Sequence, residues 1–234
     1  MKRWINFSHK QKIYNGNFGY IKSFHSFAPY MDIKERILVK SDELFNRYGI
    51  RSVSMDDIAA QLGMSKKTLY QYYTDKDDLV SAVFTGAMEH NRDACMMEKK
   101  AAENAIHEVF LAFDRVQEMF ANMNPSVLFD LEKYHPSTFG KFKDFKNVFL
   151  YQMIKSNLER GIKEELYRED VDIDVLSRYR IQSIMLAFNS EVFPNNRNNI
   201  LHIEQQLIEH FLYGLANTKG QKLIQKYKTQ RIKK

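Results

Sequence analysis

The stretch that decides the fold of this chain is residues 54–79, SMDDIAAQLGMSKKTLYQYYTDKDDL. Ser54 can accept a hydrogen bond at the start of a helix, and Asp57 three residues later completes a capping-box pattern. Gly63 follows the apolar stripe of that helix where the chain must turn, because glycine adopts left-handed backbone angles without a Cβ clash. Ser65 then caps a second short helix. Two short helices joined by a tight turn indicate a helix-turn-helix unit.

The second helix of this unit, residues 65–72, carries polar side chains on the faces that its inward Leu69 leaves free. In the DNA major groove, lysine commonly reads guanine and glutamine commonly reads adenine. We therefore expect base contacts from Lys66, Lys67 and Gln71.

The order and spacing of residues over about 31–80 resemble the DNA-binding segment of the TetR (tetracycline-repressor) family of bacterial regulators. The resemblance is carried by Ile37, Leu38, Leu44, Phe45, Gly49, Ile58, Ala59, Gly63, Ser65, Thr68, Leu69, Tyr70, Lys76 and Leu79. Tyr73 departs from the pattern, since family members most often have phenylalanine or another apolar residue there. The resemblance implies phosphate contacts from Thr68, Tyr70 and Lys76. It also implies a DNA-facing position for Tyr72.

Composition favours an all-α protein, since the 234 residues include only 4 Pro and 9 Gly. The single cysteine, Cys95, cannot form an internal disulfide and favours a reducing compartment. No run approaches the ~18 apolar residues of a transmembrane helix, and residues 1–30 lack the continuous apolar region of a secretory signal. We expect a cytoplasmic protein that does not enter a membrane.

The net charge of +6 comes from the two ends of the chain. Residues 1–30 hold five Lys or Arg and no acidic residue, and residues 217–234 hold seven and none. Either end could attract phosphates, or both could be solvated, disordered ends. Two interpretations of the basic extension 1–30 stay open: an upstream start assignment with Met31 as the true start, or a genuine basic arm. Residues 218–234 are expected to be a basic C-terminal tail.

The rest of the chain divides into two expected domains built from about nine helices. Residues 31–78 form an N-terminal three-helix helix-turn-helix DNA-binding domain. Residues 79–217 form a helical ligand-binding and dimerisation domain. Within it, Pro136 suits the first turn of a helix that runs to about residue 160. The last two helices are expected at about 173–192 and 198–217.

The last predicted helix is apolar well beyond the ~100° stripe of an ordinary surface helix. Such a helix lies either in the centre of a large monomeric core or partly against another chain. The resemblance implies that the last two helices form a four-helix bundle in a homodimer. We expect the contacts with the partner chain to come from Leu207, Ile208, Phe211 and Leu215. A dimer also suits a palindromic DNA operator, because two-fold symmetry doubles the base contacts.

The resemblance also implies a small-molecule effector site among the helices of the second domain. Pockets are mostly apolar with a few placed polar groups. Polar residues within apolar stripes are therefore useful pointers, and Gln117 and Arg180 are two of these. The candidate ligand-binding residues are Phe113, Gln117, Phe120, Tyr134, Phe145, Tyr151, Arg180 and Phe188. An apolar stripe at helical spacing is also typical of plain core.

No pattern in the sequence indicates catalysis. The seven histidines are dispersed without metal-ligand spacing, and there is no glycine-rich phosphate loop or nucleophile motif. We expect no enzyme activity, no metal and no cofactor. The sequence predicts a dimeric transcriptional regulator, a repressor released from DNA by a small molecule. The alternatives are an architectural DNA-binding protein and an all-helical ligand carrier without regulatory DNA binding.

Overall fold

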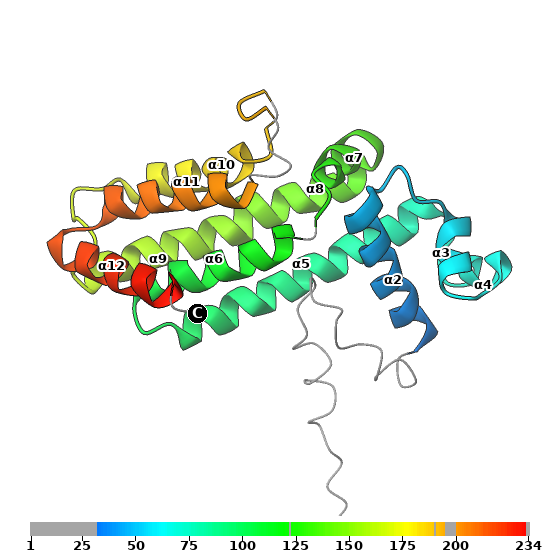
Figure 1. The fold of residues 1–234 in the computed structure, drawn as a ribbon, viewed down its shortest axis with the longest axis horizontal. Helices are drawn as coiled ribbons and strands as arrows, with labels where there is room; N and C mark the ends of the chain where they lie inside the picture. Colours follow the sequence, from blue (N-terminus) through cyan, green and yellow to red (C-terminus); the bar gives the residue numbers. More distant parts are fainter. Residues whose placement is uncertain (1–31, 122, 190, 195–199, 233–234) are drawn as a thin grey trace, which may run out of the picture.

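A computed structural model describes residues 32–121, 123–189, 191–194 and 200–232. These residues are helical throughout (Figure 1), apart from loops and an isolated antiparallel bridge between Tyr167 and Ala216. The helices are α2 (Ile33–Tyr48), α3 (Met55–Gln61), α4 (Lys66–Tyr70), α5 (Lys76–Ala101), α6 (Ala105–Ala121), α7 (Ser126–Tyr134), α8 (Pro136–Asp144), the π-helix η3 (Phe145–Leu150), α9 (Tyr151–Lys163), α10 (Ile173–Leu186), α11 (Ile200–Leu215) and α12 (Thr218–Ile232). The all-α prediction is confirmed. The predicted extension 1–30 and the expected helix start at 198 lie outside the described residues.

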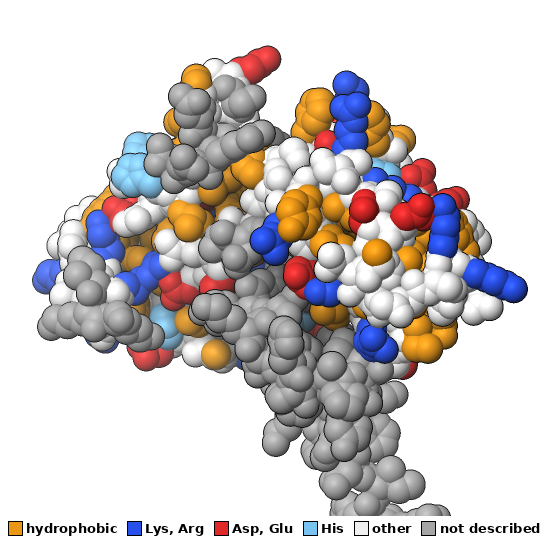
Figure 2. Space-filling view, turned by 45° about the vertical axis from the view of Figure 1, so that its right-hand side comes forward, with side chains coloured by type: hydrophobic (Ala, Val, Ile, Leu, Met, Phe, Trp, Pro, Cys, Tyr) orange, Lys and Arg blue, Asp and Glu red, His pale blue; other side chains and the backbone are white. Residues whose placement is uncertain are grey.

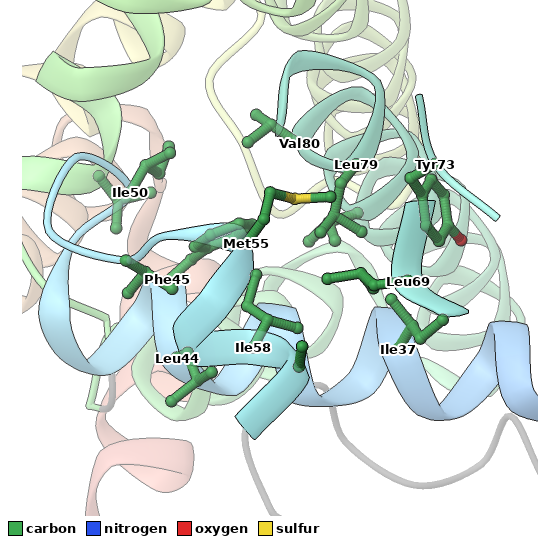
Figure 3. Close-up of a cluster of buried hydrophobic side chains, with 14 of the residues drawn as sticks. Ile37, Leu44, Phe45, Ile50, Met55, Ile58, Leu69, Tyr73, Leu79 and Val80 are labelled. Carbon is green, nitrogen blue, oxygen red and sulfur yellow. The ribbon is translucent and has the colours of Figure 1, made fainter. Parts of the chain in front are cut away.

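The first three described helices pack on the start of α5 around one buried cluster (Figure 3). Ile37 from α2, Ile58 from α3 and Leu69 from α4 are all fully buried there. Tyr73 is buried beside them, which explains how a tyrosine serves where the TetR pattern has an apolar residue: its ring fills the core. Burial also raises the pKa of the Tyr73 hydroxyl to about 12. The three helices predicted from the sequence therefore share one buried core with the start of α5.

Helix α5 connects this unit to the rest of the molecule. Figure 1 shows it running from the helix-turn-helix end toward the end where α9 and α12 lie. Its 26 residues correspond to a length of roughly 40 Å. Leu79, Val80 and Val83 near its start belong to the helix-turn-helix core, whereas Cys95 near its end is buried in the helical domain. A displacement of α5 would therefore be transmitted to both parts.

The predicted helix from Pro136 to about residue 160 is one continuous rod made of α8, η3 and α9, which ends at Lys163. Its middle, residues 145–150, is wound as a π-helix. By contrast, the helix predicted over 173–192 ends earlier, at Leu186. The side-chain oxygen of Asn189 accepts hydrogen bonds from the backbone N–H groups of Glu191 and Val192, which turns the chain there.

The C-terminal segment differs from the expected tail, because residues 218–232 form the helix α12. Ile224 and Tyr227 are buried against α6 and α11 in the larger core of the helical domain. The Tyr227 hydroxyl donates to Glu103 and accepts from Asn104. Gly220 allows the close approach of this helix, since an added Cβ would lie 2.2 Å from the carbonyl oxygen of Leu166. Because residues 218–232 are rich in Lys and Arg, the sequence prediction did not recognise them as a helix with one apolar face.

Within the described residues, no helix combines the length and apolarity that a membrane crossing requires.

Candidate nucleic-acid interface and the cavity behind it

Helix α3 begins with the predicted capping box. The Ser54 Oγ accepts the backbone N–H of Asp57 at 3.1 Å, and the Asp57 carboxylate accepts the backbone N–H of Ser54 at 2.8 Å. The Ser54 hydroxyl also donates to the Asp57 carboxylate at 2.6 Å, and this bond together with the one from the Ser54 backbone N–H holds the pKa of the Asp57 carboxyl below its usual value. Gly63 then takes a positive φ of 64° and turns the chain toward α4. The local signals in the sequence therefore set the start of α3 and the turn after it.

Helix α4 is short, and its rotation is fixed from two sides. At its start, Ser65 accepts the backbone N–H of Thr68 at 3.0 Å, and the two hydroxyls lie 2.8 Å apart. Inside, Leu69 is fully buried in the core of the three-helix unit. With Leu69 facing inward, the opposite faces of α4 must face solvent. This is the geometry that a helix needs before it can enter a DNA groove.

Most of the predicted DNA contacts lie on this outer surface. Lys66, Lys67 and Gln71 are exposed, Tyr70 is 41% exposed and Tyr72 is 38% exposed. Thr68 is half-buried, and its hydroxyl already shares a hydrogen bond with Ser65. The structure thus brings these residues to one end of the molecule, while their roles toward DNA stay predictions.

Lys66 and Lys76 already have partners in the protein. The Lys66 ammonium lies 2.8 Å from the Asp56 carboxylate, whose hydrogen bond and charge raise the pKa of Lys66. The Lys76 Nζ donates to the backbone carbonyl of Ile50 at 2.6 Å, and partial burial lowers the pKa of Lys76. Lys76 therefore fastens the start of α5 to the loop between α2 and α3. Spacing alone did not reveal this second role, because Ile50 lies 26 residues earlier in the chain.

Figure 2 shows Lys and Arg side chains standing out from the helix-turn-helix end of the molecule, beside acidic side chains. The acids near the predicted contacts include Asp56 and Asp57 on α3 and Asp77 and Asp78 on α5. Basic and acidic groups are thus mixed on this surface. DNA attraction here depends on where individual charges lie, because the acids offset any uniform positive field.

A cavity of about 290 Å³ lies behind this unit, among α2, α5, α6, α7, α8, η3, α9, α10 and α11. Its wall is mostly apolar and rich in phenylalanine and methionine. Of the eight predicted ligand residues, five line it: Phe113, Phe120, Phe145, Arg180 and Phe188. Their roles toward a ligand remain predictions. The wall also includes Asp42 and Asn46 of α2, which the sequence analysis did not single out.

The other three predicted ligand residues lie outside the cavity wall. The Gln117 amide oxygen accepts a hydrogen bond from Arg231 of α12 at 2.8 Å. Tyr134 is 37% exposed, and the Tyr151 hydroxyl donates to Asp174 at 2.5 Å. The structure therefore does not bring these three residues to the cavity wall, and their role toward a ligand stays a prediction.

Two of the polar residues of the cavity wall are arginines, Arg115 and Arg180. Arg115 is held in place by hydrogen bonds to Glu98, Asn91 and Cys95 at 2.8, 2.8 and 3.0 Å. Arg180 donates to Ser183 and lies 3.6 Å from the buried Glu204 carboxylate, which is too long for a hydrogen bond. Burial raises the pKa of Glu204 to about 7.

The cavity and the helix-turn-helix unit are joined through α7 and the loop before it. The backbone N–H of Asn124 donates to the carbonyl of Asn46 at 2.7 Å, and the Asp130 carboxylate accepts the N–H of Arg51 at 3.0 Å. Gly49 packs so closely here that an added Cβ would lie 2.7 Å from the Ser126 hydroxyl. Val127 of α7 belongs to the helix-turn-helix core and also lines the cavity. The cavity wall and the helix-turn-helix core are therefore in direct contact.

Comparison with known proteins identifies this architecture. The family described as bacterial regulatory proteins, tetR family, matches residues 37–83. The regulatory protein TetR from Rhodobacter sphaeroides has a similar fold, with a TM-score of 0.64, 14% identity, and coverage of 77% of this chain and 97% of that one. The chain belongs to the TetR family of helix-turn-helix transcriptional regulators.

Among relatives of this TetR-family chain is YvaF of Bacillus subtilis (strain 168), called an uncharacterized HTH-type transcriptional regulator. The two are 35% identical over 105 residues, which cover 43% of this chain and about half, 53%, of YvaF. A transcriptional regulator from Saccharomonospora viridis, solved in complex with choline, has a TM-score of 0.60 and 18% identity over 79% of this chain and 97% of that one. Family membership confirms that the protein is a DNA-binding regulator and not an enzyme.

Three of the four predicted dimer contacts are buried within the protomer of this TetR-family structure. Ile208, Phe211 and Leu215 point into the protomer and are 4%, 6% and 1% exposed. Phe211 and Leu215 pack in the same core as α6 and α12, so they are not free to contact a partner chain. Leu207 is half-buried. The apolar residues that α10 leaves at the surface are instead Val175 and Tyr179, which are 57% and 45% exposed.

Proposed function

We propose that this TetR-family protein is a homodimeric repressor that binds a palindromic duplex through α4 and leaves it when a small molecule fills the cavity. The observation that carries the proposal is the orientation of α4. Buried Leu69 presents exposed Lys67, Tyr70 and Gln71 to solvent, and a mostly apolar cavity lies directly behind the same unit. As a repressor the protein would act on the chromosome, in the cytoplasm.

The proposed DNA contacts divide into two kinds. Lys67 and Gln71 would read base edges, with Lys66 joining them once it leaves Asp56. Thr68, Tyr70 and Lys76 would contact phosphates, with Tyr72 beside them. Lys76 suits this role because it lies at the start of α5, where the helix dipole and free backbone N–H groups favour an anion. Phosphate contacts fix the register of α4 on the duplex, and base contacts select the sequence.

For the dimer, the support comes from the exposed apolar residues of α10. Val175 and Tyr179 are large side chains that a monomer leaves in water, and Tyr179 lies on the same helix as cavity residues Arg180 and Ile184. A second copy related by two-fold symmetry would cover them. The cavity would then lie just behind the dimer surface, so that a ligand could alter the separation of the two DNA-binding units.

An effector is supported by the cavity itself. Its mostly apolar wall with a few fixed polar groups is typical of small-molecule sites. The structural relative from Saccharomonospora viridis was solved in complex with choline, so a protein of this fold can hold a small molecule. To release DNA, a ligand must bind the DNA-free conformation more tightly. A ~100-fold preference corresponds to ~2.7 kcal/mol of coupling.

Selection of bound duplexes from a random pool by the full chain tests the proposal. The enriched sequences should be palindromic, with the half-sites about one helical turn apart or a multiple of it. Gln71→Ala should change the selected base at one position of each half-site, at a cost of ~1–3 kcal/mol. The matched control is Gln221→Ala, which removes an exposed glutamine from α12 and should leave the selected sequence unchanged.

The same experiment separates the alternatives. An architectural DNA-binding protein would enrich no sequence, and an all-helical ligand carrier would retain no duplex above background. Either result would contradict the proposed repressor. Enrichment of a palindrome by the Gln71→Ala variant without any change in base preference would remove Gln71 from the contacts.

A further inference from the structure

The charges of the cavity wall are mostly neutralised within the protein. The charged residues that line it are Asp42, Glu98, Glu108, Arg115, Lys146 and Arg180. Arg115 lies 2.8 Å from Glu98, and Arg180 lies 3.6 Å from Glu204. Glu108 accepts from Arg160 of α9 at 3.0 Å. Two of the wall residues, Asp42 and Lys146, have no ion pair with any residue that the structure describes.

Asp42 is a half-buried acid of the cavity wall. It lies on α2, and among the described residues its carboxylate accepts a hydrogen bond from Asn46, whose amide donates to Oδ1 at 3.0 Å. Burial raises the pKa of the Asp42 carboxyl to about 7, against the weaker opposing effect of Asn46; the nearby Glu43 raises it further. An ionised carboxylate in such a place is short of a positive partner.

Lys146 differs from Asp42 in reach. Both residues are half-buried, but a lysine can lay its aliphatic stem along an apolar wall while its ammonium stays in water. The short side chain of aspartate cannot do this. The unmet charge inside the cavity is therefore negative.

We propose that the cavity takes an apolar molecule with a cationic head, of the alkylamine or alkylammonium class, and that Asp42 pairs with that head. This deepens the proposed function, on which it rests, by naming the class of effector. The apolar part would lie along the wall toward Ile181 and Phe211, at the α10 and α11 side of the cavity. The aromatic rings of Phe84 and Phe142 also line the cavity, and ring faces attract ammonium groups.

A ligand of this class that pairs with Asp42 would contact the DNA-binding unit directly, because Asp42 lies on α2. Leu44 and Phe45 follow it on α2, and both are buried in the helix-turn-helix core. A cation paired with Asp42 would thus be attached to the first helix of that unit, while its apolar part contacts the helical domain. One ligand would bridge the two parts whose relative position decides DNA binding.

Isothermal titration calorimetry on the full chain at pH 7.5 tests the ligand class with three probes of equal chain length: n-decylamine, n-decanol and decanoate. Decylamine should bind at least about tenfold more tightly than decanol. A hydrogen bond to a charged group contributes more free energy than tenfold tighter binding requires. Decanoate should bind most weakly. Asp42→Asn should abolish the preference for the amine over the alcohol.

The matched control is Glu43→Gln, which removes the adjacent acid of α2. Glu43 pairs with Lys40 and does not line the cavity, so the preference for decylamine should persist. Equal binding of amine and alcohol by the unmodified protein, tightest binding of decanoate, or no binding of any probe would overturn the proposal. The unmodified protein decides these outcomes even if the Asp42 variant fails to fold.

The titration contains no DNA, so its failure is distinguishable from failure of the proposed function. A protein that binds decylamine through Asp42 but selects no DNA sequence would keep the ligand class and lose the repressor. A protein that selects a palindrome but binds only the alcohol or the carboxylate would support the DNA-binding function and contradict the proposed ligand class.

Discussion

The helix-turn-helix unit and the helical domain solve the packing problem differently. In the first, Ile58 and Leu69 are fully buried in a cluster that closes around them (Figure 3). In the second, side chains of the same kinds, such as Ile184 and Met119, are half-buried and face a cavity of about 290 Å³. A DNA-reading helix needs one fixed orientation, which a filled core supplies, whereas a ligand site needs space. The filled core therefore suits the DNA-binding unit, and the cavity suits the proposed ligand site.

The largest effect that can break this comparison is a matched loss of volume. Ile58→Ala in the filled core should destabilise the protein by about 2–5 kcal/mol, because the buried methyl groups lose close contacts on every side. Ile184→Ala in the cavity wall should cost less than half as much, since atoms that face a void have fewer partners to lose. Urea denaturation of both variants measures this. Equal losses would mean that the cavity is filled in solution.

A matched gain of volume should give the opposite asymmetry. Ala59→Leu adds atoms to the filled core, where Ala59 is 3% exposed, and should cost about 1–3 kcal/mol. Ala112→Leu adds the same atoms to the cavity wall and should be nearly neutral or stabilising. Thermal melting measures both. Titration of Ala112→Leu with decylamine should also show weaker binding; unchanged binding would place the ligand elsewhere.

The comparison also explains which features the sequence could predict. Helix starts were predicted where a side chain near in sequence makes the cap, as Ser54 and Ser65 do. A turn was predicted where glycine takes a positive φ, as Gly63 does. The filled core followed from apolar spacing alone, because nearly every inward residue there is apolar. Local patterns therefore sufficed for the DNA-binding unit.

The helical domain was harder because its side chains depend on helices distant in sequence. Gln117 looked like a pocket residue between Phe113 and Phe120, but Arg231 of the unpredicted α12 binds it. Because α12 was not predicted, Phe211 was expected to contact a partner chain. In the structure Phe211 is buried within the protomer. Asp42 was missed for the converse reason. In sequence it resembles an ordinary surface acid of an amphipathic helix, and only the fold places it at the cavity wall.

A smaller effect concerns Asp42 and pH. Its pKa is raised to about 7 in the folded protein, above the usual value of 3.8, so the unfolded chain releases this proton at a lower pH than the folded one. Stability from this group is fully present below about pH 4 and is lost as pH rises through 7. Asp42→Asn should therefore gain stability relative to the unmodified protein between pH 4 and 7, and the gain should stay constant above 7.

Melting temperatures across that range measure the gain. Glu204, whose pKa is also raised to about 7, should leave a remaining slope in the variant. Parallel curves for the two proteins over the whole range would show that Asp42 is ionised and solvated in solution, which would also weaken its assignment to the cavity.

The smallest effect lies on the DNA-facing surface, where Lys66 and Lys67 are neighbours with different surroundings. Lys66 pairs with Asp56 at 2.8 Å, whereas Lys67 has no ion pair with a described residue. Lys67→Ala should reduce the slope of log affinity against log salt by about 1 per subunit. The variant lacks one ammonium group at the DNA surface, so fewer counterions are released when it binds. Lys66→Ala should change the slope less, because that ammonium must first leave Asp56. Fluorescence anisotropy with a labelled duplex at several salt concentrations measures both slopes. Asp56→Asn is the control: it releases Lys66, so it should steepen the slope and tighten binding. Equal slopes for the two lysine variants would mean that breaking the Lys66–Asp56 ion pair costs little free energy when DNA binds. The ion pair would then have no effect on the salt dependence of DNA affinity.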